Sequence, residues 1–310
     1  MPSPPRPRFI IIGAMKCATS SLYEQLVAQP NVFMPTPKEP NFFSDDPIYA
    51  QGIDWYWQLF ESASPEDLCG EASTHYTKLP TYPETIARIQ EHLGTDLKLI
   101  YMMRHPIQRL VSHYIHEWTQ RVISVDLNTA VEQHPEMIDY GRYSLQIEPY
   151  LEAFGPDRVL PIFFEQFCNA PDQELQRVCE FIGYPNPPQW QELERSNVSS
   201  QRMRQSVLRD LIVHAPILST IRKRLIPQGV RDRIKGLWQM KKRPQLTPEN
   251  QTKVKSIFDQ DLQTLGQWLG VELTCDTFKT AAQVSPQGWP GWSKSSANGF
   301  EPPETGSPCY

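Results

Sequence analysis

Short runs of consecutive apolar residues alternate along the chain with longer stretches in which apolar residues recur every three or four positions. Three runs cover Arg8–Ile12, Leu97–Met103 and Arg158–Phe164, and Leu68–Glu71 is a shorter candidate. Runs that are apolar at nearly every position are typical of strands buried on both faces of a sheet. They therefore predict parallel strands in the interior of the fold.

Each of the three longer runs is followed by apolar residues at helical spacing, which predicts a helix behind each strand. Pro106 suits the first turn of the second helix, and Gly183 suits the end of the third. Near the end of the chain, Thr247 predicts the N-terminal cap of a long helix that ends at Gly270. This alternation predicts the α/β class, with a central, mostly parallel sheet flanked by helices in three layers.

The composition adds a domain boundary to this pattern. The chain has 310 residues, of which 39% are hydrophobic and 21% charged, as in folded globular proteins. We expect one domain over residues 1–283 and an irregular tail over 284–310, where Pro, Gly and Ser dominate. Trp289 and Trp292 are candidates to dock on the domain, because disordered tails rarely carry aromatic side chains. No apolar run approaches the ~18–20 residues that span a membrane.

The charge is unevenly distributed. The net charge of −5 argues against a general nucleic-acid-binding surface. Residues 202–243, however, contain 12 Lys and Arg against two acids, interleaved with apolar residues, which predicts a basic helical segment. We interpret this segment as a solvated helical subdomain whose positive face attracts an anionic substrate. The alternative is peripheral contact with a membrane surface.

The six cysteines are scattered, with no C-x-x-C pair and no accompanying histidine pattern. This spacing predicts neither a metal site nor a disulfide framework. The N-terminal residues also lack the apolar stretch of a signal peptide. Reduced thiols and the missing leader together predict a cytoplasmic protein.

The first chemical motif joins the first strand to the first helix, in the sequence FIIIGAMKCATSS (residues 9–21). A helix start with free N–H groups and hydroxyls suits a bound phosphate. The loop differs from a Walker A loop, in which the lysine directly precedes the hydroxyl residue. An ordinary strand–helix turn is the alternative interpretation. The candidate ligands are Lys16, Ala18, Thr19, Ser20 and Ser21.

Two further motifs follow. Arg104 ends the second long strand and Ser112 lies about two turns into the next helix, so a guanidinium and a hydroxyl could bind a second phosphate at the carboxyl ends of the strands. Alternatively, Arg104 is a structural ion-pair partner and Ser112 a surface residue. Residues 38–44 read KEPNFFS, which alone would be a solvated turn anchored by two phenylalanines.

Together the three motifs resemble the sulfotransferase superfamily that uses 3′-phosphoadenosine 5′-phosphosulfate (PAPS). Their order and spacing are most similar to the branch with heparan sulfate sulfotransferase domains and their bacterial relatives. The resemblance covers roughly residues 8–275, including GEASTHY at 70–76. It implies a P-loop-like α/β fold and a reaction that needs no metal.

The resemblance also implies roles for individual residues. Lys16 and the adjoining loop residues Ala18, Thr19, Ser20 and Ser21 would bind the 5′-phosphosulfate. Lys16 would also stabilise the charge on the leaving phosphate oxygen, and Glu39 would be the general base. The remaining implied ligands of the nucleotide are Arg104 and Ser112 at the 3′-phosphate, Tyr143 in the nucleotide pocket, and Arg204 or Arg202 in a late segment that closes over it.

The implied reaction moves the sulfuryl group of PAPS to a hydroxyl or amine and releases adenosine 3′,5′-bisphosphate (PAP). The acceptor could be a saccharide, a lipid or a small alcohol, and the oligomeric state is open. Ala72 stands where heparan sulfate enzymes have a lysine, which argues against a heparan-like acceptor. Two other functions compete: a nucleotide-phosphate kinase or NTPase with a degenerate loop, and a non-catalytic scaffold. His75, His105 and His113 are alternative bases.

Overall fold

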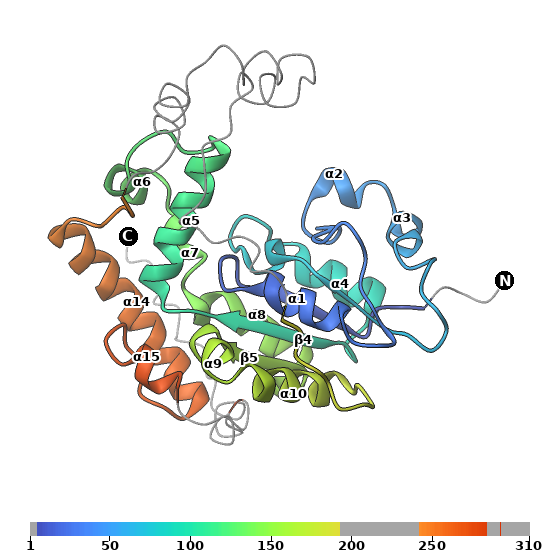
Figure 1. Ribbon diagram of the computed structural model, residues 1–310. Helices are drawn as coiled ribbons and strands as arrows, with labels where there is room; N and C mark the ends of the chain where they lie inside the picture. Colours follow the sequence, from blue (N-terminus) through green and yellow to red (C-terminus); the bar gives the residue numbers. More distant parts are fainter. Residues whose placement is uncertain (1–4, 193–241, 284–291, 293–310) are drawn as a thin grey trace, which may run out of the picture.

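The computed structural model describes residues 5–192, 242–283 and 292, and a five-stranded parallel sheet lies at the centre of the described part (Figure 1). The strand order is β2-β3-β1-β4-β5, and each neighbouring pair is parallel. The predicted α/β class is confirmed. The strands are β1 (Phe9–Gly13), β2 (Val32–Phe33), β3 (Leu68–Ala72), β4 (Lys98–Met103) and β5 (Val159–Phe163).

The three long strands lie within one residue of their predicted positions. Every residue of β1 and β5 is buried, as expected for strands covered on both faces. The short strand predicted near residue 68 is also present as β3. The edge strand β2 is absent from the prediction, because two residues are too few to show a periodicity.

Helices pack on both faces of the sheet. On one side α1 contacts β1 and β2, and α10 contacts β4 and β5. On the other, α8 contacts β5 and joins α4 and α14, and α14 also runs beside α5 (Figure 1). The helices are α1 (Thr19–Val27), α2 (Asp46–Tyr49), α3 (Ile53–Gln58), α4 (Thr85–Leu93), α5 (Pro106–Gln120), α6 (Leu127–Gln133), α7 (Glu136–Asp139), α8 (Tyr143–Phe154), α9 (Phe164–Asn169), α10 (Pro171–Ile182), α14 (Pro248–Leu269) and α15 (Phe278–Ala281), with 3₁₀ turns η1 (Thr74–Thr77) and η2 (Pro156–Arg158).

The ends of α14 follow the predicted signals. The hydroxyl of Thr247 accepts a hydrogen bond from the N–H of Asn250 at 3.3 Å, which caps the helix start. Gly270 ends the helix with a φ of 69°, a conformation that glycine adopts without a Cβ penalty.

Two predicted features fall largely outside the described residues. All but the last two residues of the basic segment 202–243 lie there, including Arg202 and Arg204. Of the tail, only Trp292 is described, and its indole N–H donates to the main-chain oxygen of Val159 at 2.8 Å. Among the helices that the structure describes, none has the length and apolar character needed to cross a membrane.

Candidate active site

The loop between β1 and α1 leads into a helix start whose first main-chain N–H groups lack partners within the helix. Ala18 precedes α1 in the left-handed region, with a φ of 68°. The N–H of Ser21 turns back to the oxygen of Ala18 at 3.0 Å, whereas the N–H groups of Thr19 and Ser20 have no acceptor within the helix. Left-handed backbone at alanine costs about 1–2 kcal/mol, and such strain is concentrated at functional loops.

The turn η1 is fixed against the end of β1. A Cβ at Gly13 would lie only 1.9 Å from the hydroxyl oxygen of Thr77, so only glycine fits there. The same hydroxyl donates to the main-chain oxygen of Ile12 at 2.9 Å. The residues after β3 are therefore held beside the end of β1, where the predicted phosphate-binding loop begins.

Lys38 connects the first motif to the third. Its Nζ lies 3.3 Å from the hydroxyl of Thr19 and 3.1 Å from the hydroxyl of Ser20. The same nitrogen donates to Oε1 of Glu39 at 3.0 Å. One ammonium group therefore lies between the start of α1 and the predicted base.

Glu39 is anchored at its main chain and its side chain. Its N–H donates to the oxygen of Ala72 at 3.1 Å, and its Oε2 accepts from the hydroxyl of Thr74 at 3.3 Å. The carboxylate nevertheless stays 33% exposed, so that it can meet a substrate. Glu39 is thus a positioned, accessible carboxylate between the loop after β1 and η1.

The second motif is tied to the loop by Tyr143. This side chain is fully buried, and its hydroxyl accepts from the N–H of Arg104 at 3.1 Å and donates to the oxygen of the same residue. The hydroxyl also lies 3.8 Å from Sγ of Cys17 in the loop. The structure therefore gives Tyr143 a positioning role, while its contact with a nucleotide stays a prediction.

Arg104 carries an unused hydrogen-bond donor. Its guanidinium packs over the ring of Phe164 at 4.5 Å, and its Nε is buried without a partner in the described part of the chain. Ser112 is buried at the end of the second turn of α5. An orphaned guanidinium donor close to a strand end fits an anionic ligand.

Further charges surround Arg104. Burial raises the pKa of Glu165, and the Arg104 guanidinium opposes this shift. Burial and the charge of Arg104 both lower the pKa of Arg243, so the end of the basic segment lies within electrostatic reach of the second motif. The sequence marks Arg243 only as one of many basic residues.

Sequence reasoning missed two cations. Lys38 stands out in the sequence only as part of its motif, although its position next to Glu39 is a signal that could have identified it. Arg109 is fully buried on α5, with Nη2 donating to the oxygen of Met137 at 2.6 Å and with Nε and Nη1 unpartnered in the described part. Helical spacing alone places Arg109 among polar residues and gives no sign of its burial.

The three candidate histidines lie in different surroundings. His105 contacts the main-chain oxygen of Cys275 at 2.9 Å through Nε2. His113 is buried on α5, where burial and the charge of Arg109 hold its pKa well below the usual range. His75 follows Thr74 directly and lies within electrostatic reach of Glu39.

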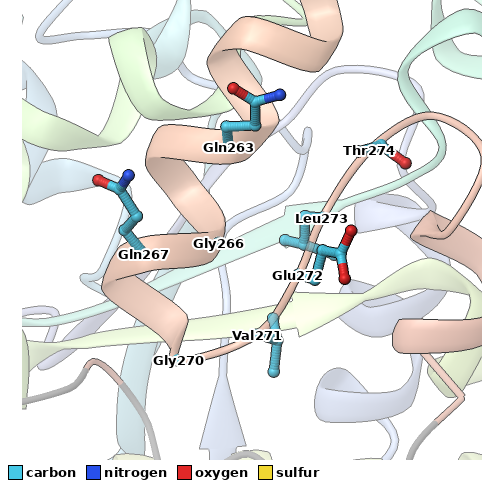
Figure 2. A pocket seen from close by; sticks show the side chains of 8 residues that line it. All are labelled: Gln263, Gly266, Gln267, Gly270, Val271, Glu272, Leu273 and Thr274. Atoms are coloured by element: carbon cyan, nitrogen blue, oxygen red, sulfur yellow. The ribbon is translucent and has the colours of Figure 1, made fainter.

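A surface pocket of about 530 Å³ lies away from these residues, around the C-terminal end of α14 (Figure 2). Figure 2 shows Gln263 and Gln267 on the helix and Glu272 on the segment that follows it. None of the candidate site residues lines this pocket. Its shape therefore carries no information about the chemistry of the three motifs.

The fold and the site define an α/β protein with a predicted phosphate-binding helix start, a second basic motif at the neighbouring strand end, and a carboxylate beside the first. Comparison with known families matches residues 6–266 to the sulfotransferase domain. The chain belongs to this family, which confirms the predicted family and class of enzyme. The kinase alternative has no support in the comparisons.

Individual relatives agree with this assignment. Heparan sulfate glucosamine 3-O-sulfotransferase 3B1 of Mus musculus is 32% identical over 189 residues, which are 57% of this chain and 46% of the relative. Membrane-associated sulfotransferase kil1 of Dictyostelium discoideum is 33% identical over 156 residues, 48% of this chain and 32% of its own length. The chain thus spans about half the length, or less, of these curated relatives.

A solved structure supports the fold. The crystal structure of a sulfotransferase from Alicyclobacillus acidocaldarius superposes with a TM-score of 0.61 and 24% identity, over 87% of this chain and 98% of that one. The P-loop-like α/β architecture expected from the resemblance is therefore confirmed.

The predicted cytoplasmic location is wrong on the present comparisons. The relatives include heparan sulfate 3-O-sulfotransferases and an enzyme named as membrane-associated. The prediction rests on the scattered cysteines and on the lack of an apolar stretch among the N-terminal residues. Neither feature has a physical link to a compartment strong enough to outweigh these relatives.

Proposed function

We propose that the protein transfers the sulfuryl group of PAPS to a hydroxyl or amine of an acceptor, and that PAP is the second product. The acceptor is a saccharide, a lipid or a small alcohol. The heparan sulfate enzymes among the relatives favour a saccharide. Lys16 and Glu39 are the proposed catalytic residues.

One observation carries the proposal. Lys38 reaches the hydroxyls of Thr19 and Ser20 with the same nitrogen that contacts Glu39. A sulfuryl donor bound at the helix start would therefore be separated only by the Lys38 side chain from Glu39, a carboxylate that can take a proton. This arrangement suits group transfer from a phosphate-bound donor to a neighbouring acceptor.

The residues present fit the nucleotide. The first-turn N–H groups and hydroxyls of Thr19 and Ser20 would hold the 5′-phosphosulfate, with Lys16 alongside. Arg104, with its orphaned Nε, and Ser112 would hold the 3′-phosphate. When bound, PAPS supplies an activated sulfuryl group, which needs no metal ion for transfer in this scheme.

Glu39 takes the proton of the acceptor hydroxyl while the acceptor oxygen bonds to sulfur. The bond between sulfur and the bridging phosphate oxygen breaks in the same step, and Lys16 stabilises the negative charge left on that oxygen. Lys38 fixes the position of Glu39 relative to the loop hydroxyls, because its ammonium group contacts both. PAPS and the acceptor are thereby converted into PAP and the sulfated acceptor, and the proton of the acceptor hydroxyl ends on Glu39.

The first experiment separates the sulfotransferase from the kinase class. We expect PAP to raise the melting temperature and ATP with Mg²⁺ to leave it nearly unchanged. The opposite pattern would exclude the PAPS site. A titration of Arg104→Ala should then lose most of the PAP-induced shift.

The second experiment tests the base. With labelled PAPS and pools of saccharides, lipids and alcohols, we expect label in an acceptor pool and a fall of kcat by about 10²-fold or more in Glu39→Gln. PAP affinity should stay within a few-fold, because the amide keeps the shape of the side chain. The matched control is Glu61→Gln, a change at an exposed glutamate after α3. Transfer by Glu39→Gln within a few-fold of wild type would remove Glu39 from this role.

A further inference from the structure

We infer that Asp45, His75 and Tyr82 form the acceptor-binding face of this site and that it takes an uncharged, hydroxyl-bearing ring, such as a neutral sugar, in preference to a polyanion. The inference rests on the proposed function, because it takes Glu39 as the base that the acceptor hydroxyl must reach. It goes further by naming the acceptor class and the residues that recognise it.

The segment that carries Glu39 is fastened to the residues after β3 along its length. The contacts are Glu39 Oε2 with the Thr74 hydroxyl (3.3 Å), the Asn41 N–H with the Ser73 hydroxyl (3.1 Å), the Phe43 N–H with the Tyr76 hydroxyl (3.5 Å), and Asp45 Oδ2 with His75 Nδ1 (3.0 Å). Because the first and last of these contacts involve neighbouring residues of η1, the Asp45–His75 pair is held at a fixed place relative to the base.

The pair presents a neutral imidazole. Burial and the nearby Lys78 lower the pKa of His75, although the carboxylate of Asp45 opposes the shift. Asp45 also accepts from the hydroxyl of Ser44 at 3.1 Å, which fixes the carboxylate. With Nδ1–H donated to Asp45, Nε2 remains as a hydrogen-bond acceptor for a substrate hydroxyl.

An aromatic ring completes this face. The ring of Tyr82 stacks on His75 with centroids 5.0 Å apart and an interplanar angle of 15°. Burial and the charge of Asp45 raise the pKa of Tyr82 to about 12, so its phenol stays neutral and can hydrogen-bond. His75 and Asp45 are each 25% exposed at their side chains. A carboxylate, an imidazole nitrogen and a phenol beside a flat ring provide both the polar and the apolar contacts that a sugar ring needs.

The cations around this face are already engaged. Lys38 contacts the loop hydroxyls and Glu39, and Arg88 donates to Asp46 at 2.6 Å. Lys78 is 9% exposed and its Nζ lies 5.6 Å from the ring centre of Tyr140. As far as the described residues go, a polyanion would therefore meet carboxylates here, because the cations named above already have partners.

The experiment compares a neutral oligosaccharide with heparan sulfate as acceptors of label from PAPS. We expect transfer to the neutral oligosaccharide, with a KM that changes little between 50 and 300 mM NaCl (roughly the range over which surface charge is screened). Transfer confined to heparan sulfate, with a KM that rises steeply with salt, would overturn this inference and leave the proposed function intact. If PAP fails to bind, the proposed function itself fails. Binding of PAP without transfer to either saccharide also overturns the inference.

The residues are tested by His75→Phe, which keeps a flat ring against Tyr82 and removes both nitrogens. We expect the KM for the neutral acceptor to rise at least about tenfold, with kcat and PAP affinity within a few-fold of wild type. The control is His134→Phe, since His134 forms a similar pair with Glu136 (Nδ1–Oε1, 3.0 Å) on another part of the surface. Equal KM values for His75→Phe and wild type would overturn the assignment. Direct titration of the oligosaccharide in the presence of PAP gives the same comparison without turnover.

Discussion

The phenol of Tyr143 brackets the main chain of Arg104, accepting a hydrogen bond from its N–H at 3.1 Å and donating one to its carbonyl oxygen. The phenol oxygen of Tyr143 also lies 3.8 Å from Sγ of Cys17, in the loop after β1. One buried side chain on α8 thus connects the ends of two neighbouring strands. The two motifs that we propose bind phosphate are consequently held in fixed relative positions by a residue that is itself shielded from solvent.

Tyr143→Phe should loosen this connection. The main-chain groups of Arg104 lose their partner, which costs about 1–3 kcal/mol when such groups stay buried. We expect a lower free energy of unfolding in urea and weaker PAP binding in calorimetry. Tyr184→Phe is the control, because it removes a hydrogen bond of similar length to the oxygen of Pro30. Unchanged PAP affinity in a folded Tyr143→Phe variant would contradict the positioning role.

Arg104→Ala should discriminate between two nucleotides. A lost charge-assisted contact is worth about 1.5–3 kcal/mol, or roughly 10- to 100-fold in affinity. We expect that loss for PAP and little change for adenosine 5′-phosphate, measured by calorimetry. Arg158→Ala removes an arginine paired with Asp96 before β5 and should affect neither nucleotide. Equal losses for both nucleotides would count against binding of the 3′-phosphate.

Lys16→Ala should separate catalysis from folding. Lys16 lies in the loop with a φ of 71° and is partly exposed, so its removal leaves the core intact. We expect kcat to fall at least about 10²-fold, because the lost charge acts on the leaving oxygen, with the melting temperature nearly unchanged. Lys98→Ala is the matched control, because Lys98 begins β4 at the end of the strand that is remote from Arg104. Near-wild-type turnover would refute the assignment of the loop.

The sheet was predictable because burial on both faces leaves a local pattern. Strands such as Leu97–Met103 are apolar at consecutive positions, and the cap residue Thr247 carries its own signal. Local reasoning also predicts Lys16 as a ligand in the loop after β1, whereas the role of Glu39 is predicted only by the family resemblance. What it could not supply is which of these segments touch, since the contact of Lys38 with Thr19 spans 19 positions and depends on the sheet order.

Buried polar residues were the least predictable part. Helical spacing gives Tyr143 and Arg109 the same appearance as surface residues, yet both are fully buried. Whether a polar side chain faces the core, a ligand or solvent is decided by the partners that tertiary packing provides. For the same reason the sequence pointed to no special role for Glu71.

Glu71 makes the stability of the protein depend on pH. Its side chain is fully buried on β3, and neither carboxyl oxygen has a hydrogen-bond partner within the described residues. Burial raises the pKa of Glu71 to about 8, with Tyr76 opposing the shift. Between the ordinary value near 4.5 and this value, the folded protein keeps a proton that the unfolded chain has released. Stability from this group is therefore present at low pH and is lost as pH rises toward 8.

Glu71→Gln should flatten this dependence, because an amide does not titrate. We expect wild type to lose on the order of a few kcal/mol of unfolding free energy between pH 5 and pH 8, and the variant to lose much less. The measurement is urea denaturation at both pH values, with Glu66→Gln, an exposed glutamate just before β3, as the control. Ala72, next to Glu71, accepts the hydrogen bond that anchors Glu39, so the variant should also keep PAP binding at higher pH. Parallel pH profiles for wild type and Glu71→Gln would show that this carboxyl does not control the stability.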